Sequence, residues 1–201
     1  MAIENGKALR KGEMTRERIL HRAADTASIY GLDDLTIGSL AAELGMSKSG
    51  LYAHFGSKEE LQLATIAAAR ERYLQTAVAP GLDAPKGLAQ IERTMEYLLR
   101  YLENGTFPGG CFFNSVNAEF HGRPGAIRDN IREGKAGWRA RLARMVKDAQ
   151  RNGEMRRDVD ANYFAFELDA FINAANWTLD DPQTIALTRR AIRACIERVK
   201  L

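Results

Sequence analysis

Apolar residues recur at helical spacing along most of this 201-residue chain. The first stripe begins after Thr15, and its members lie three or four residues apart: Ile19, Leu20, Ala23, Ala24, Ala27 and Tyr30. This spacing places side chains on one face of an α-helix, whereas a half-buried strand would alternate. Gly31 followed by Leu32 is typical of a left-handed cap with a hydrophobic contact. The pattern therefore predicts a helix from about residue 15 to residue 30.

Two short helices and one long helix are predicted next. Thr36 and Ser47 are good capping residues, and they precede the segments IGSLAAEL and KSGLYAHF. Ser57 and Glu60 have the spacing of a capping box, in which the serine accepts from the N3 amide and the glutamate reaches back. The helix that they open is expected to run towards Val78. Three helix-breaking residues are expected to end it: Pro80, Gly81 and Pro85.

The rest of the chain also has helical periodicity, with gaps between the segments. The predicted segments are about 86–103, the short apolar piece CFFNSVNAEF, a long helix after Pro124 that reaches about Asn152, 160–179 and 182–199. No segment has the alternation of a convincing strand. The predicted fold class is therefore all-α, with about nine helices.

Composition excludes some classes of protein but does not select one. The chain is 45% hydrophobic and 27% charged, as in an ordinary globular protein, and its net charge of +3 is too small to identify a nucleic-acid partner. Cys111 and Cys195 lie far apart and form no CxxC, so neither a disulfide framework nor a zinc site is predicted. No signal peptide or membrane span is found, and two thiols fit a reducing compartment. We expect a cytoplasmic protein that needs no metal or cofactor.

The segment MSKSGLYAHFGSKEEL, residues 46–61, carries the most specific pattern. Gly45 precedes it and allows a tight turn with positive φ between two short helices, which is typical of a helix-turn-helix. In that motif the second helix enters the major groove of DNA with its first residues facing the bases. Here the helix starts with small or long polar residues: Ser47, Lys48, Ser49 and Gly50. Gly50 costs the helix about 1 kcal/mol relative to alanine, which favours a close approach of DNA.

Residues 15 to about 62, and above all the run LTIGSLAAELGMSKSGLYAHFGSKEEL, resemble the DNA-binding domain of the TetR/AcrR family of transcriptional regulators. The resemblance implies an all-helical homodimer that binds DNA through three helices and a small ligand through a larger domain. It implies phosphate contacts by Thr36, Tyr52, His54 and Lys58, and base contacts by Ser47, Lys48, Ser49 and Tyr52. Ser39 departs from the family pattern, so a backbone contact there is expected to be weaker or absent. The predicted division is a flexible basic arm (1–13), a DNA-binding domain (14–60) and an effector-binding and dimerisation domain (61–201).

The effector site is predicted among the middle helices of the larger domain. Its candidates are mostly aromatic: Tyr97, Tyr101, Phe107, Cys111, Phe112, Asn114, Asn117, Trp138, Phe171 and Trp177. In GGCFFNSVNAEF, the glycines allow close backbone approach and the asparagines are polar groups that need partners when buried; a ligand is one such partner. Core and cavity wall share this composition, so a purely structural role stays open for each aromatic residue.

The last two helices are predicted to form the dimer. Small residues there would let helices approach across a two-fold axis: Ala170, Ala174, Ala191, Ala194 and Cys195. The resulting hypothesis is a repressor that binds a palindromic operator and is released by a small molecule. An alternative is a DNA-binding regulator that has no small-molecule effector and senses oxidation through Cys111. An enzyme is not expected, because the chain lacks a G-x-S-x-G elbow, a glycine-rich phosphate loop and an HExxH motif.

Overall fold

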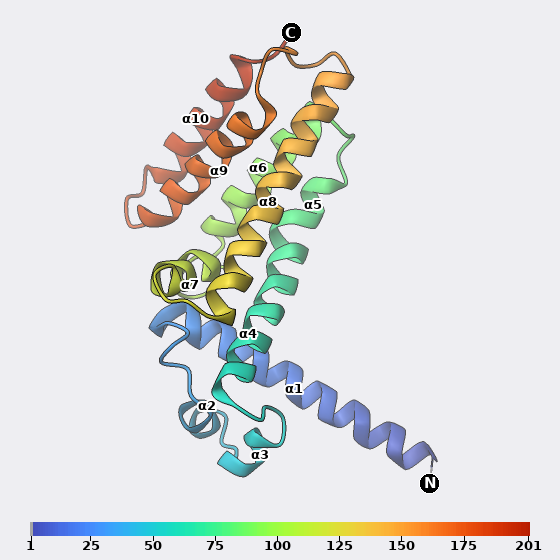
Figure 1. The fold of residues 1–201 in the computed structure, drawn as a ribbon, viewed down its shortest axis with the longest axis vertical. Coiled ribbons are helices and arrows are strands. Elements are labelled where there is room, and N and C mark those ends of the chain that lie inside the picture. Colours follow the sequence, from blue (N-terminus) through green and yellow to red (C-terminus); the bar gives the residue numbers. More distant parts are fainter. Residues whose placement is uncertain (1) are drawn as a thin grey trace. The chain divides into compact units, whose positions relative to one another are not determined.

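The computed structural model describes residues 2–201, with side chains from residue 12 onwards, and its fold is all-α over these residues (Figure 1). The helices are α1 (Ala2–Tyr30), α2 (Ile37–Glu43), α3 (Lys48–Tyr52), α4 (Lys58–Tyr73), the π-helix η1 (Leu74–Val78), α5 (Ala79–Leu82), α6 (Leu88–Glu103), α7 (Phe112–Phe120), α8 (Ala126–Arg151), α9 (Ala161–Trp177) and α10 (Thr184–Glu197). All nine predicted helices are present; η1 and the one-turn α5 follow α4. The β pairing seen in this part of the chain is one isolated bridge between Met155 and Lys200.

The chain divides into two compact units, and the division is not sequential. The first unit contains residues 1–72 and 107–127, and the second contains residues 73–106 and 128–201. The first unit therefore includes α7, which packs against α1. The functional boundary expected at residues 60 and 61 stays a prediction, because compactness does not show which residues bind DNA.

Glycine ends α1 as the sequence predicts. Gly31 has φ 94°, and its amide donates to the carbonyl of Ala27 at 3.0 Å, while Leu32 beyond it is fully buried. The helix begins at Ala2 rather than near Thr15, so helical backbone covers residues 2–13. Residue 1 and the side chains of residues 2–11 lie outside the described part, and the predicted basic arm stays a prediction.

The turn between α2 and α3 is a Schellman motif. Gly45 has φ 64°, its amide donates to Ala42, and the amide of Met46 donates to the carbonyl of Ala41 at 2.9 Å. This geometry confirms the predicted role of Gly45. The helix α3 ends at Tyr52, which is earlier than expected, and the chain continues in turns to Gly56. The core beneath the motif consists of the fully buried Leu40, Leu51 and Phe55.

The two ends predicted for the α4 helix need correction. Ser57 accepts a hydrogen bond from the amide of Glu60 at 3.1 Å, as expected, but the Glu60 carboxylate accepts from the amide of Gly56 at 3.0 Å. The predicted break at Pro80 is wrong, since helical structure continues through η1 and α5 to Leu82. Pro80 sits in the first turn of α5, directly after η1, where the N–H of Ala79 donates to the carbonyl of Leu74 five residues back. The hydrogen bonding is therefore of the π type just before the residue that has no N–H to donate.

The second unit is a bundle of α5, α6, most of α8, α9 and α10. Its core is formed by fully buried apolar side chains that include Val78, Ile91, Met95, Leu98, Val146, Phe164 and Leu168. The carboxylate of Asp160 caps α9 by accepting from the amides of Asn162 and Tyr163 at 2.8 and 3.1 Å. The helices α9 and α10 lie side by side (Figure 1). Within the described part, no helix is long and apolar enough to cross a membrane.

Candidate functional site

The predicted DNA-binding residues lie at the starts of α2, α3 and α4, at the end of α3 (Tyr52) or shortly after it (His54), all in the first unit. Gly50 and His54 are partly exposed, and the other six are exposed: Thr36, Ser47, Lys48, Ser49, Tyr52 and Lys58. Exposed polar side chains at the N-termini of three helices therefore form one polar surface over the buried core of the helix-turn-helix. Free amides at such starts and exposed donors are suited to binding an anion such as a phosphate.

Hydrogen bonds already fix the first turns of α2 and α3. The Ser47 hydroxyl accepts from the amide of Gly50 at 3.1 Å and lies 3.2 Å from the Ser49 hydroxyl. A Cβ at position 50 would lie 3.0 Å from the Ser47 hydroxyl, so glycine leaves room for the cap. This cap is a structural reason for Gly50 that the sequence pattern alone does not indicate. Close approach of DNA at this residue stays a prediction.

Ser39 has a role that the sequence analysis missed. The Thr36 hydroxyl accepts from the amide of Ser39 at 3.0 Å, and the Ser39 hydroxyl accepts from the amide of Thr36 at 3.2 Å. This is a reciprocal capping box in which serine stands in the place of the usual glutamate. The departure from the family pattern therefore keeps the start of α2 well ordered.

The side chains of Lys48 and Tyr52 on α3 are exposed. The Lys48 chain passes over Gly38, where a Cβ would lie 3.3 Å from Lys48 Cε. Tyr52 is 54% exposed, which excludes a role only in the core. His54 leans on the buried Phe55, with ring centroids 6.2 Å apart, and its ring is partly exposed.

Lys58 differs from the other predicted contacts because it already has an anionic partner. Its Nζ donates to Asp33 Oδ1 at 3.1 Å and also to the Asp33 carbonyl. The second oxygen of Asp33 accepts from Arg123 Nη1 at 2.7 Å. The guanidinium of Arg123, and after it the ammonium of Lys58, lowers the pKa of Asp33 below its usual value. Asp33 is therefore a carboxylate shared by two cations.

The turn that carries Asp33 is fixed from α7 and α4. Glu119 of α7 accepts from the amides of Leu32 and Asp33, each at 2.8 Å, and a Cβ on Gly31 would lie 3.2 Å from that carboxylate. Gln62 of α4 donates to the Leu32 carbonyl at 2.7 Å. Successive backbone amides that point at one carboxylate form a strong anion cradle. The helix α7 thus binds directly to the turn that precedes α2.

The predicted effector residues fall in both units. Phe107, Cys111, Phe112, Asn114 and Asn117 belong to the first, and Tyr97, Tyr101, Trp138, Phe171 and Trp177 belong to the second. Phe107 and Phe112 are fully buried with ring centroids 5.7 Å apart, whereas Trp177 is 63% exposed. The indole N–H of Trp138 donates to Asp169 Oδ1 at 3.1 Å, and burial raises the pKa of that carboxyl. Effector binding by these residues stays a prediction.

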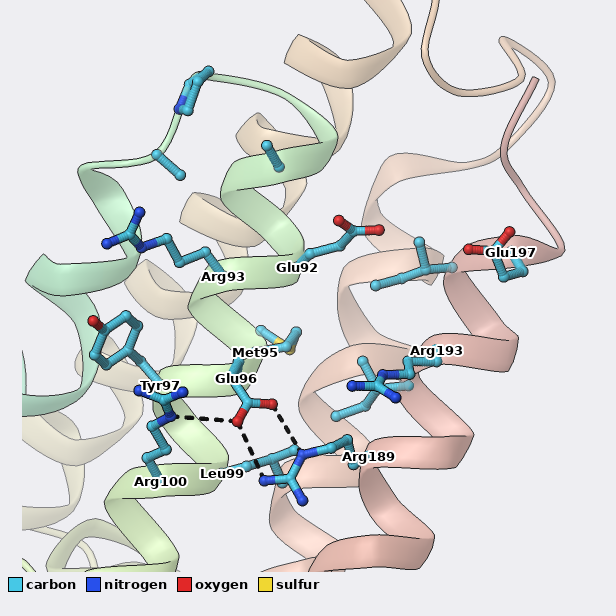
Figure 2. A pocket seen from close by; sticks show the side chains of 15 residues that line it. Glu92, Arg93, Met95, Glu96, Tyr97, Leu99, Arg100, Arg189, Arg193 and Glu197 are labelled. Carbon is cyan, nitrogen blue, oxygen red and sulfur yellow. Dashed lines mark hydrogen bonds and ion pairs between the residues drawn. The ribbon is translucent and has the colours of Figure 1, made fainter.

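A groove of about 990 Å³ lies between α6 and α10 in the second unit (Figure 2). Of the predicted effector residues, Tyr97 lines it. Arg189 of α10 donates to Glu96 of α6 at 2.9 Å, and Arg100 donates to the same carboxylate at 3.4 Å. Glu92 pairs with Lys200 at 3.0 Å. The carboxylates of Glu92 and Glu96 already have cationic partners. The ion pair between Glu96 and Arg189 is therefore best explained as a contact that stabilises the packing of α6 against α10.

An exposed apolar face covers α9 and α10, and the sequence analysis did not identify its large members. It consists of side chains that are each more than half exposed: Tyr163, Phe166, Trp177 and Leu187. Three of the predicted dimer residues, Ala170, Ala174 and Ala194, are also exposed, and Ala191 is partly so. Cys195 is buried, and burial together with Glu167 raises the pKa of its thiol to about 12. Exposed apolar patches of this kind mark interaction surfaces.

The fold and its exposed surfaces define a helix-turn-helix protein with a separate C-terminal helical domain. Residues 19–65 match the family model of bacterial regulatory proteins, tetR family, and residues 87–195 match the tetracyclin repressor-like C-terminal domain. The second match alone covers more than half of the chain. The chain belongs to the TetR family of transcriptional regulators, as the sequence predicted.

Solved structures have the same fold. A TetR transcriptional regulator from Chloroflexus aurantiacus is 28% identical, with a TM-score of 0.85 over 96% of this chain and 99% of that chain. A putative transcriptional regulator from Saccharomonospora viridis in complex with choline is 23% identical, with a TM-score of 0.76 over 94% and 99%. AibR in complex with isovaleryl coenzyme A and operator DNA is 20% identical, with a TM-score of 0.70 over 88% and 95%. A comparison with curated proteins found no match.

Proposed function

We propose that this TetR-family regulator is a repressor that binds a palindromic operator as a homodimer and is released by a small molecule. The observation that carries the proposal is the exposed polar surface at the start of α3, held on a buried helix-turn-helix core. In this proposal the bases are contacted by Ser47, Lys48, Ser49 and Tyr52, and the phosphate backbone is contacted by Thr36, Tyr52, His54 and Lys58. A regulator of transcription acts where the chromosome is, so the cytoplasmic location is part of the proposal.

The apolar face of α9 and α10 supports a homodimer. Large apolar side chains on two adjacent helices would be costly to leave in water, and a two-fold axis would cover the same face of both chains. The small exposed residues Ala170, Ala174 and Ala194 would let the backbones approach closely across that axis. The DNA-binding domain of each chain is called its head. Two heads related by a two-fold axis require two half-sites in inverted order, which is why the operator is proposed to be palindromic.

Two of the similar structures support a small-molecule effector. One contains choline, and the other contains isovaleryl coenzyme A together with operator DNA. These are ligands of those proteins, and they do not identify the ligand of this one. For release to occur here, the effector must bind the DNA-free conformation better than the DNA-bound one. A coupling free energy of about 1–3 kcal/mol would produce a clear change in operator occupancy.

Lys48 provides the direct test of base recognition. We expect Lys48→Ala to lose discrimination at one operator position, with a change of about 1–3 kcal/mol between the preferred base and the others. Lys58→Ala, which removes a phosphate contact, is the comparator: it should weaken binding to all sequences equally and lower the salt dependence. The measurement is the affinity of each variant for the operator selected by the wild-type protein and for its single-base variants. Uniform weakening by Lys48→Ala would instead assign Lys48 to the backbone.

A further inference from the structure

Asp33 joins two parts of the first unit that lie far apart in the sequence. It occupies the turn before α2, and its carboxylate binds Lys58 at the start of α4 and Arg123 just after α7. Lys58 is a proposed phosphate contact, whereas Arg123 lies in the segment that follows the end of α7. One carboxylate thus joins the cation proposed to contact a phosphate to a cation from a distant part of the chain.

The geometry makes Asp33 a competitor of DNA for Lys58. An ammonium group has three donors, and in this structure Lys58 directs donors to the Asp33 carboxylate and to the Asp33 carbonyl. A phosphate oxygen needs the same group. Asp33 thus takes two of the three donors of Lys58, and its carboxylate offsets the positive charge that would attract a phosphate.

Arg123 sets how strongly Asp33 attracts Lys58. Its Nη1 lies 2.7 Å from Asp33 Oδ2, which is shorter than the 3.1 Å between Lys58 Nζ and Oδ1. Arg123 satisfies part of the negative charge, so the carboxylate that Lys58 leaves behind keeps a cationic partner. Without Arg123, Lys58 would be the remaining cation among the ion pairs of Asp33 in the described part of the chain.

The position of the turn depends on α7 as well. Glu119 holds the amides of Leu32 and Asp33, and the amide of Gly109, just before α7, donates to the Ser28 hydroxyl at 3.0 Å. A movement of α7 would therefore move both the backbone of the turn and Arg123. The same helix carries Asn114 and Asn117, two of the predicted effector residues.

We propose that Asp33 restrains Lys58 from the operator backbone and that Arg123 relieves this restraint by sharing the carboxylate. The inference rests on the proposed function, because it assumes that Lys58 contacts a phosphate. A displacement of α7 that withdraws Arg123 leaves Asp33 to Lys58 and lowers operator affinity. Arg123 is then a positioning residue, which acts on DNA through Asp33 and Lys58.

Asp33→Asn is the first test, with Asp34→Asn as its matched control. Both substitutions remove one negative charge at neighbouring positions, but Asp34 is exposed and has no ion pair among the described residues. We expect Asp33→Asn to tighten operator binding by about threefold per head, or about tenfold for a dimer, since an exposed pair of this kind is weak. Asp34→Asn should give a smaller gain that reflects net charge alone.

Arg123→Gln is the second test, and it is measured in two backgrounds. In the wild-type chain it should weaken operator binding by about threefold per head, and Arg123→Lys should restore most of the affinity. In Lys58→Ala, Arg123→Gln should have no further effect, because the residue through which it acts is gone. Thermal unfolding of each variant shows that the heads remain folded.

The outcomes separate this inference from the proposed function. If Lys58→Ala binds the operator as tightly as the wild type, the phosphate contact is absent and the inference falls with it. If Lys58→Ala weakens binding but Asp33→Asn behaves like Asp34→Asn, the proposed DNA contact stands and the restraint by Asp33 is refuted. An equal loss from Arg123→Gln in both backgrounds would show that Arg123 acts independently of Lys58, which also overturns the inference.

Discussion

Gly109→Ala is expected to destabilise the protein by at least ~3 kcal/mol, the upper end of the usual cost of overpacking. A Cβ at this position would lie 1.9 Å from the carbonyl oxygen of Ser28, 2.3 Å from its carbonyl carbon and 2.7 Å from the amide nitrogen of Ile29. These atoms belong to the backbone of α1 and cannot move aside as a flexible side chain would. The loop before α7 must therefore separate from α1. The hydrogen bond from the Gly109 amide to Ser28 would be lost with it.

Urea unfolding followed by circular dichroism measures this effect. Gly137→Ala is the control, because a Cβ at residue 137 in the middle of α8 meets no atom within 4 Å. That substitution is expected to stabilise the protein by about 0.5–1 kcal/mol through the helix propensity of alanine. A Gly109→Ala protein as stable as the wild type would mean that the loop does not approach α1 as the structure shows.

The second large effect is expected at the apolar face of α9 and α10. Leu187→Glu should convert the proposed homodimer into a monomer, because a two-fold axis would place two carboxylates in one apolar interface. A monomer binds one half-site at a time. It therefore loses the high effective concentration that the second DNA-binding domain of a dimer has at the second half-site once the first domain is bound. We expect operator affinity to fall by at least about 100-fold, within the usual range of avidity gains.

The mass of the protein in solution tests this directly. The chain has a mass of 22.4 kDa, so sedimentation distinguishes one copy from two. Leu201→Glu makes the same chemical change at another exposed leucine, beyond the end of α10, and should leave the dimer intact. A wild-type monomer, or a Leu187→Glu variant that stays dimeric and binds the operator normally, would show that this face is not the interface.

Local signals made much of the first unit predictable. Gly31 and Gly45 end helices with positive φ as expected, because the residue that follows a helix is chosen for its own backbone conformation. The serine cap at Ser57 was predicted for the same reason, since its donor lies three residues away. Pro80 was misread because the π-helix η1 precedes it, and the sequence does not show that helical structure continues past this residue in that form.

Long-range contacts could not be predicted from the sequence. Asp33 and Arg123 are 90 residues apart, and nothing in either neighbourhood indicates the other. Gly109 was expected to allow close approach, but the group it approaches, the backbone of Ser28, is known only from the fold. Trp177 was predicted to line the effector cavity. An apolar stripe on a helix can face a core, a ligand or a partner, and the sequence alone does not distinguish these. The exposure of Trp177 makes a partner surface the simpler explanation.

The most direct test of the account is selection of bound DNA from a random pool by the wild-type protein, followed by sequencing. A dimeric operator-binding protein should enrich an inverted repeat whose two half-sites are separated by a fixed distance near one helical turn or a multiple of it. Such a site would show that two α3 helices read DNA across a two-fold axis. A pool without an enriched motif, or one enriched only in a single unpaired half-site, would contradict the proposed dimeric operator-binding protein.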